Sequence, residues 1–167
     1  MTIEVLVEDD PRCDPADVQA AAQHAMDALH VHPAAELCIR FVEPAAIEVL
    51  HEHWMDLAGP TDVMSFPMDE LRPGTPERPS EPGVLGDIVL CPQVAAAQAE
   101  KLGHPVADEL LMLTVHGVLH LLGHDHAEPE EEREMFALQA DLLASYLALT
   151  GRSTTAAPRP GSAGDRS

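Results

Sequence analysis

The sequence predicts a single domain that combines a small set of β-strands with several α-helices. The chain has 167 residues, a length that suits one domain with a substantial hydrophobic core. Four short segments show the apolar alternation or apolar runs of strands, and five longer segments carry apolar residues at helical spacing. Apolar residues make up 46% of the chain and charged residues 23%, so wholesale disorder is excluded.

The N-terminal half predicts two strands, each followed by a helix. The strands, over 3–7 and 36–42, alternate apolar and polar side chains, as half-buried strands do. The first helix, over 15–30, begins with an Asp-Pro pair, a favoured N-cap followed by the residue favoured at the first helical position. The second helix begins at Pro44, and the Gly59-Pro60 turn ends it.

The rest of the chain is predicted to form two strands and three helices. The strands cover 61–66 and 84–90, and the segment 71–83 between them carries a proline at every third position. Such a segment cannot pack as a helix or a central strand, so an exposed loop of polyproline type is expected. The helices begin at prolines or at an acidic run that the helix macrodipole favours, and they cover 92–101, 105–122 and 128–150. The helix 105–122 is apolar on nearly every side, which predicts burial at the centre of the domain.

Composition and charge bound the function classes. Residues 152–167 are small and polar without periodicity, so a disordered tail is expected after a domain that spans 1–151. That domain has six basic and 28 acidic residues, a formal charge of −22, which disfavours a free-standing basic nucleic-acid module. Neither a transmembrane helix nor a signal peptide is expected. The spacing of Cys13, Cys38 and Cys91 fits neither a zinc knuckle nor a disulfide framework, so reduced thiols and a cytoplasmic location are expected.

Three histidines in and just after the central helix form the most informative pattern. His116 and His120 are four residues apart, so they share one face of the helix. Gly123 can end the helix in a left-handed turn that brings His126 to the same ion. Three neutral imidazoles suit a divalent cation with an open position for water, and zinc lowers the pKa of such a water to about 7. The sequence therefore predicts a metal site at the end of this helix.

The residue after the first histidine distinguishes between kinds of metalloenzyme. Metzincin proteases share the H-x3-H-x5-H spacing, but they carry Glu directly after the first histidine as general base. Gly117 stands at that position, which disfavours a protease. Glycine costs about 1 kcal/mol relative to alanine inside a helix. Either the close approach of a neighbouring element or room for a bulky substrate is expected to require it.

The histidine segment resembles the signature of the YbeY family, metal-dependent endoribonucleases and ribosome-maturation factors of bacteria. The segments Thr61–Phe66 and Leu85–Ile88 are also similar to that family, and the resemblance covers about residues 1–150. It implies an α+β fold in which about five helices surround a small mixed sheet of about four strands. It also implies that the metal site lies at the end of the central buried helix.

The resemblance implies cleavage of single-stranded RNA in the maturation of small-subunit (16S) ribosomal RNA and in ribosome quality control. The implied partners are the small subunit or its proteins and an assembly GTPase, with no membrane. One Zn2+ is the usual metal, nickel or another divalent ion is compatible, and the implied ligands are His116, His120 and His126. Either a water or the RNA 2′-hydroxyl can serve as nucleophile, and the sequence leaves both open.

One position departs from the family pattern. Family members often carry an arginine in the helix before the Thr-Asp-Val strand, where the resemblance implies a contact with RNA phosphate. Met55 stands at that position, so another cation is expected to replace the arginine. The candidates in the folded region are Arg40, Arg72 and Lys101.

Four further residues near the motifs have alternative interpretations. Asp125 either orients a ligating histidine or caps the turn after Gly123. Ser65 either lines the cleft, as the resemblance implies, or is an ordinary strand serine. His124 is expected to point away from the ion on an exposed loop, and Trp54 is expected in the core.

Two other function classes stay open. The first is a non-catalytic ribosome-assembly factor with a structural zinc, which the acidic charge and Met55 favour. The second is another metallohydrolase such as a protease, which Gly117 disfavours. Because lysine and arginine normally supply affinity for phosphate, the acidic domain is expected to bind isolated RNA weakly and to depend on partners.

Overall fold

A computed structural model describes residues 2–55, 59–124 and 128–153, except for the side chain of Met55. Within these residues the chain forms four strands and five helices, which confirms the predicted α+β content. Every predicted element is present within a few residues of its expected bounds. In chain order they are β1 (Thr2–Val7), α1 (Pro15–Ala28), β2 (Glu36–Phe41), α2 (Pro44–Met55), β3 (Val63–Pro67), β4 (Val84–Leu90), α3 (Pro92–Leu102), α4 (Val106–Leu121) and α5 (Pro129–Leu149).

The four strands form one mixed sheet in the order β1-β2-β4-β3. The β1–β2 and β2–β4 pairs are parallel, and β3 runs antiparallel to β4. Strand β3 therefore lies at one edge of the sheet, where it pairs with β4 alone among the described strands. One long edge of β3 therefore has no partner strand among the described residues.

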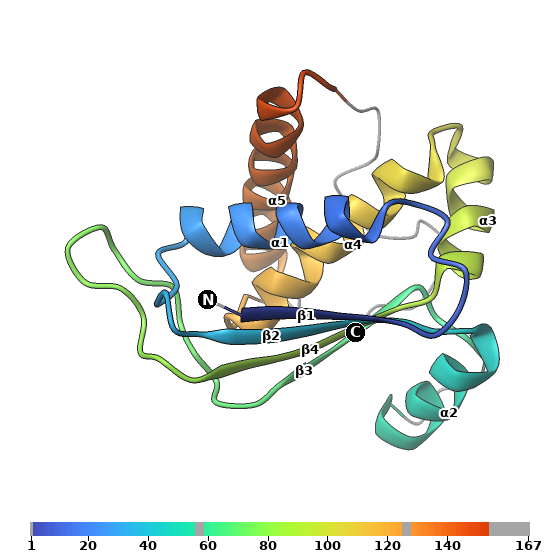
Figure 1. Cartoon of the computed structure of the whole chain (residues 1–167), viewed down its shortest axis with the longest axis horizontal. Helices are drawn as coiled ribbons and strands as arrows, with labels where there is room; N and C mark the ends of the chain where they lie inside the picture. The colour runs from blue at the N-terminus through green and yellow to red at the C-terminus, as the bar shows by residue number, and fades with distance from the viewer. Residues whose placement is uncertain (1, 56–58, 125–127, 154–167) are drawn as a thin grey trace.

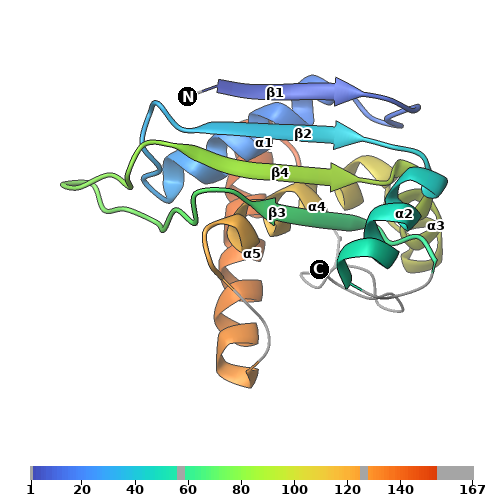
Figure 2. The same cartoon turned by 90° about the horizontal axis from the view of Figure 1, so that it is seen from below.

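The two faces of the sheet are covered differently. Helices α1 and α4 lie across one face and α5 packs against α4, whereas α2 lies at one end of the opposite face (Figures 1 and 2). Successive residues of β4 show this division. Ile88 belongs to the main core with the apolar residues of α4, and Val89 belongs to a smaller cluster with Ile47 of α2. The central helix α4 is buried along most of its length, as predicted.

The proline-rich segment 71–83 has no helix or strand, as predicted, but it is not wholly exposed. Leu71 is buried in the main core, and Ser80 is buried as well. The backbone N–H groups of Gly74 and Ser80 donate to the carbonyl oxygens of Leu29 and His30, each at 2.9 Å. Prolines exclude regular structure, but the N–H groups between them still find partners at the end of α1. The segment is therefore fixed at several points.

A buried polar network links the start of α4 to the start of β3. His104 donates from Nε2 to Oε1 of Glu109 at 2.5 Å, and Glu109 is fully buried. With its amide oriented to donate, Nε2 of Gln98 lies 3.1 Å from both Oε2 of Glu109 and Oδ2 of Asp62. These hydrogen bonds compensate for the burial of two carboxylates. They hold the end of α4 that is remote from the predicted metal site.

The C-terminal end of the described chain is tied to α1. Arg152, the first residue of the predicted tail, donates from Nη2 and Nη1 to the two carboxylate oxygens of Asp17, at 2.7 and 2.9 Å. The hydroxyl of Tyr146 donates to the same carboxylate at 2.5 Å. The rest of the predicted tail, 154–167, lies outside the described residues.

Candidate metal centre

Two of the three predicted ligands lie side by side on α4. The ring centroids of His116 and His120 are 4.5 Å apart, and the ring planes meet at 73°. His116 is fully buried, and the Nε2 atoms of both rings are buried. The i, i+4 spacing therefore has the predicted result, two imidazoles close together on one face of the central helix.

Helix α5 fixes the orientation and the tautomer of His116. Nδ1 of His116 lies 2.8 Å from Oε1 of Gln139, which is fully buried. An amide oxygen can only accept, so Nδ1 carries the proton and Nε2 of the neutral ring keeps its lone pair. The ring of Phe136, one turn before Gln139, stacks on His116 with the planes 17° apart. Metal-ligating histidines typically donate their other N–H in this way, so the donor chemistry fits a divalent cation.

Gln139 lies outside every motif that the sequence shows. The one feature of the sequence that could indicate its role is an amide side chain at a buried position of α5. The other buried residues of this helix are Met135, Leu142, Leu143, Tyr146 and Leu147. A polar side chain at such a position needs a hydrogen-bond partner. The sequence does not say which partner, because His116 is 23 residues away.

The turn after α4 has the predicted geometry. Gly123 has φ = +93°, the left-handed conformation that glycine adopts most readily. The N–H groups of Gly123 and His124 donate to the carbonyl oxygens of His120 and Leu119, each at 3.0 Å, which closes the helix end. His124, which was expected to be exposed, is half-buried.

The third predicted ligand is not among the described residues. His126 and the neighbouring Asp125 both lie in the segment 125–127, outside the described part of the chain. Within the described part, no group of three or more potential ligands is close enough to hold one ion. The complete ligand set therefore stays a prediction.

Close packing explains Gly117. A Cβ atom at this position would lie 3.0–3.1 Å from three side-chain atoms of Ile88 on β4. Of the two explanations that the sequence left open, the close approach of a neighbouring element is the one observed. The side of α4 at Gly117 faces the sheet, so a glutamate there would point into β4. This packing leaves no room for the general base of a metzincin protease.

Ser65 lies on the same side of the sheet as the histidine helix. It pairs in register with Ile88, and residues opposite each other in an antiparallel pair point to the same face. Since Ile88 contacts α4 at Gly117, the side chain of Ser65 also points toward α4. Its Oγ atom is buried and has no hydrogen-bond partner among the residues that the structure describes.

Of the three candidate cations, Arg72 lies at the histidine turn. A Cβ atom at Gly123 would overlap Nη1 of Arg72 and lie 2.7 Å from its Cζ, so the guanidinium rests directly against the turn. Arg72 is exposed, and no carboxylate within the described ranges pairs with it. Arg40 instead donates to Glu8 at 2.7 Å, and Lys101 is exposed in the last turn of α3.

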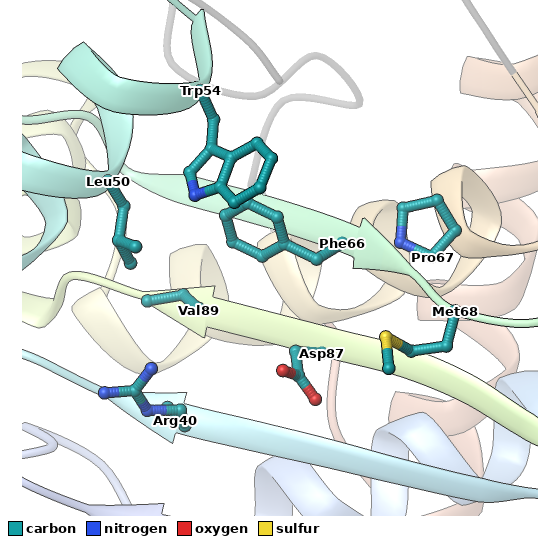
Figure 3. A pocket seen from close by; sticks show the side chains of 8 residues that line it. All are labelled: Arg40, Leu50, Trp54, Phe66, Pro67, Met68, Asp87 and Val89. Atoms are coloured by element: carbon teal, nitrogen blue, oxygen red, sulfur yellow. The ribbon is translucent and has the colours of Figure 1, made fainter.

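A second candidate site lies on the opposite face of β3 (Figure 3). It is a pocket of about 510 Å3, here called the aromatic pocket, lined by Arg40, Leu50, Trp54, Phe66, Asp87 and Val89 together with Pro67 and Met68. Trp54 is 62% exposed, so the prediction that it belongs to the core is wrong. The reason is that Trp54 lies near the end of α2, beside a sheet face that no other described helix covers (Figure 2).

Comparison with known proteins supports one family. A family model described as Endoribonuclease YbeY matches residues 7–147. A protein named Endoribonuclease YbeY from Beutenbergia cavernae is 61% identical over 148 residues, which cover 89% of this chain and 99% of that protein. One of the same name from Leifsonia xyli subsp. xyli is 60% identical over 146 residues, which cover 87% and 95%.

A solved structure shares the fold. The solution structure of TM1509 from Thermotoga maritima superposes with a TM-score of 0.61 and covers 89% of this chain and 91% of its own. Its sequence is 23% identical, so the likeness concerns the fold alone.

Proposed function

Because the chain belongs to the YbeY family of endoribonucleases, we propose that it is a metal-dependent endoribonuclease that cleaves single-stranded RNA. The observation that carries the proposal is the histidine pair of α4, with His116 held by Gln139 in the tautomer that a metal ligand needs. The proposed ligands are His116, His120 and His126. Zinc is the proposed metal, and nickel or another divalent ion is the alternative.

The chain's own residues have separate tasks in this proposal. When bound, the metal supplies Lewis-acid polarisation of a phosphoryl oxygen and a site for an acidified water. Arg72 replaces the arginine of other family members, at whose position this chain has Met55. The guanidinium of Arg72 binds a phosphate of the RNA beside the turn at Gly123. Ser65 lines the cleft from the sheet side, and Asp125 either orients a histidine or caps the turn.

We further propose that the RNA is the maturing small-subunit (16S) ribosomal RNA, with an added role in ribosome quality control. No helix in the described residues has both the length and the apolar character needed to cross a membrane. A cytoplasmic location is part of the proposal, in line with three cysteines that are free in the structure. Because the domain carries a charge of −22, the small subunit, its proteins or an assembly GTPase would help to present the RNA.

The alternative is a non-catalytic assembly factor in which the metal is structural. The acidic charge and the absence of arginine at position 55 favour it. The two proposals differ in one respect: a structural site would stabilise the fold without cleaving RNA. RNA cleavage that metal-loaded wild type performs and that is lost with one ligand therefore separates them.

The test is cleavage of a labelled single-stranded 16S rRNA fragment by full-length protein of measured metal content. Wild type is compared with His120→Ala and with the control His24→Ala, which removes a histidine of α1 that bonds to Ser145. Wild type and His24→Ala are expected to carry about one equivalent of metal and to cut the RNA. His120→Ala is expected to do neither while its helical circular dichroism is retained.

Intact RNA with fully metal-loaded wild type would contradict the nuclease proposal and favour the assembly factor. A His120→Ala protein that cleaves as wild type would remove the histidine pair from the site. Product ends then identify the nucleophile, because a 2′,3′-cyclic phosphate excludes attack by water.

A further inference from the structure

The aromatic pocket lies on one face of β3, and α4, the helix that carries the histidine pair, packs against the other face. Ser65 points toward α4 from one face of β3, and the next residue, Phe66, lines the aromatic pocket on the other face. Strand β3 is an edge strand, so one of its long edges has no partner strand among the described residues (Figure 2). A single-stranded polymer that passes over the free edge of β3 can therefore reach both sites at once.

The pocket offers a flat aromatic surface. The indole of Trp54 meets the ring of Phe66 at 67° and the ring of His53 at 86°, so neither ring stacks flat on it. Leu50 and Val89 add apolar surface beside it (Figure 3). Proteins that bind single-stranded RNA commonly stack unpaired bases on aromatic side chains of this kind.

The other side of the pocket is polar. Arg40 and Asp87, on the neighbouring strands β2 and β4, line it opposite Trp54 (Figure 3). Glu8 engages Nε and Nη2 of Arg40, which leaves Nη1 as a donor, and the carboxylate of Asp87 is an acceptor. The edge of a nucleobase needs both kinds of group. The volume of about 510 Å3 is in the usual range for small organic ligands.

The charges favour a base over other occupants. A phosphate would meet Asp87, and the positive charge of Arg40 is already balanced by Glu8. Arg40 and Asp87 also limit the length of the apolar surface in the pocket. A short apolar surface suits one flat ring better than the long apolar face of a protein helix. Stacking does not depend on net charge, which matters in a domain with a charge of −22.

We propose that the aromatic pocket binds one unstacked base of single-stranded RNA, with Trp54 as the stacking surface, while a neighbouring phosphate of the same strand lies at the histidine pair. This subsite deepens the proposed nuclease function and rests on it for the identity of the polymer. It also accounts for an exposed tryptophan beside an open sheet face.

Trp54 is the single tryptophan of the chain, so its fluorescence reports the pocket directly. The experiment titrates the full-length protein, in a chelator that prevents cleavage, with a hexa-adenylate RNA and with an abasic backbone of equal length. The hexa-adenylate is expected to quench the fluorescence to saturation, and the abasic backbone is not. Anisotropy of the labelled RNA is then expected to show about tenfold weaker binding by Trp54→Leu.

The matched control is Val49→Ala, which truncates another exposed apolar residue of α2, 64% exposed and outside the pocket. It is expected to bind as wild type. Fluorescence that does not respond to hexa-adenylate, or equal losses in Trp54→Leu and Val49→Ala, would overturn the proposal.

Its failure is distinguishable from failure of the nuclease proposal. Metal-loaded protein that cuts RNA while Trp54 fluorescence stays constant would leave the nuclease standing and remove the base subsite. Saturable quenching in a protein that never cuts RNA would support the base subsite and contradict the nuclease proposal. A pocket that instead serves a protein partner would leave RNA binding unchanged in Trp54→Leu, which counts against the proposal.

Discussion

At the scale of single residues, Gly123 and Arg72 define the turn beside the histidine pair. Gly123 has a φ of +93°, a conformation that disfavours any side chain, and the guanidinium of Arg72 lies against it. The backbone on either side of Arg72 is anchored, because Leu71 is buried and the N–H group of Gly74 donates to the carbonyl oxygen of Leu29. The exposed guanidinium of Arg72 is therefore available to bind a phosphate beside the turn.

Arg72→Ala is expected to lower kcat/KM for RNA cleavage by about tenfold, equivalent to about 1.4 kcal/mol, because one charge-assisted hydrogen bond to phosphate is lost. The control is Arg78→Ala, which removes another exposed arginine of the same segment, whose atoms are not among those nearest to Gly123. It is expected to cleave nearly as wild type. Steady-state kinetics at fixed salt decide the matter, and equal losses in the two variants would show a nonspecific effect of charge.

Gly117→Val is expected to destabilise the protein by about 1–3 kcal/mol, the usual cost of overpacking, because its side chain would press on Ile88. The measurement is urea unfolding of a double-mutant cycle with Ile88→Ala. In the Ile88→Ala background the cost of valine at 117 is expected to shrink, since the obstructing atoms are gone. An unchanged cost would assign the glycine to a reason other than this contact.

At the scale of secondary structure, elements and turns whose evidence is local were predictable. The strands, the buried helix α4 and the turn at Gly123 follow from periodicity and from the glycine itself. The closeness of His116 and His120 follows from helical geometry alone. The fold class and the larger part of the histidine site are thus readable from the chain.

Features that depend on tertiary packing were not predictable. Trp54 has a large apolar side chain of the kind that often packs in a core, but whether it is buried depends on where α2 lies against the sheet. The contact between Arg72 and Gly123 joins residues 51 positions apart, and no local pattern indicates it. The hydrogen bond between His116 and Gln139 likewise depends on how α4 and α5 pack together.

The link between α1 and α5 gives a pH dependence. The guanidinium of Arg152, which donates to both oxygens of Asp17, holds the pKa of that carboxyl below its ordinary value of 3.8, and the hydroxyl of Tyr146 adds to the effect. In turn, burial and the hydrogen bond to Asp17 raise the pKa of Tyr146 to about 12. A lowered folded-state pKa stabilises the fold above pH 3.8, and this contribution is lost as the pH falls through the lowered value.

Asp17→Asn is therefore expected to lower stability by about 1 kcal/mol at pH 6, with a fall in Tm of about 2–4 °C. The difference from wild type is expected to shrink as the pH falls below 3.8 and to vanish once the pH has passed the lowered folded-state pKa, where folded wild type loses the same charge. Thermal denaturation at several pH values measures it. The control Asp141→Asn changes an exposed carboxylate of α5 and is expected to show no such difference.

At the scale of the whole molecule, the aromatic pocket and helix α4, which carries the histidine pair, lie on opposite faces of one edge strand. The core behind them is formed by α4, which contacts β3 and β4 on one side and α5 on the other. The metal would therefore be held where the sheet, α4 and α5 meet. Removal of the ion should lower the stability of the whole domain, because it would loosen the C-terminal end of α4, which Gln139 and Arg72 both contact.

Chelation is expected to lower the Tm of metal-loaded wild type, since a ligand present at 100 times its Kd stabilises the folded state by about 2.7 kcal/mol. For a domain of this size that corresponds to a shift of roughly 5–10 °C.

Gln139→Leu keeps the size of the buried side chain but removes the acceptor for Nδ1 of His116, so metal affinity should fall about 10- to 100-fold. Its Tm should then respond less to the chelator at the same total metal. The control Gln93→Leu removes an exposed amide that bonds to Asp9 and should behave as wild type. Differential scanning fluorimetry with and without chelator measures all three proteins, and a wild-type Tm that ignores the chelator would contradict a metal that is coupled to the fold.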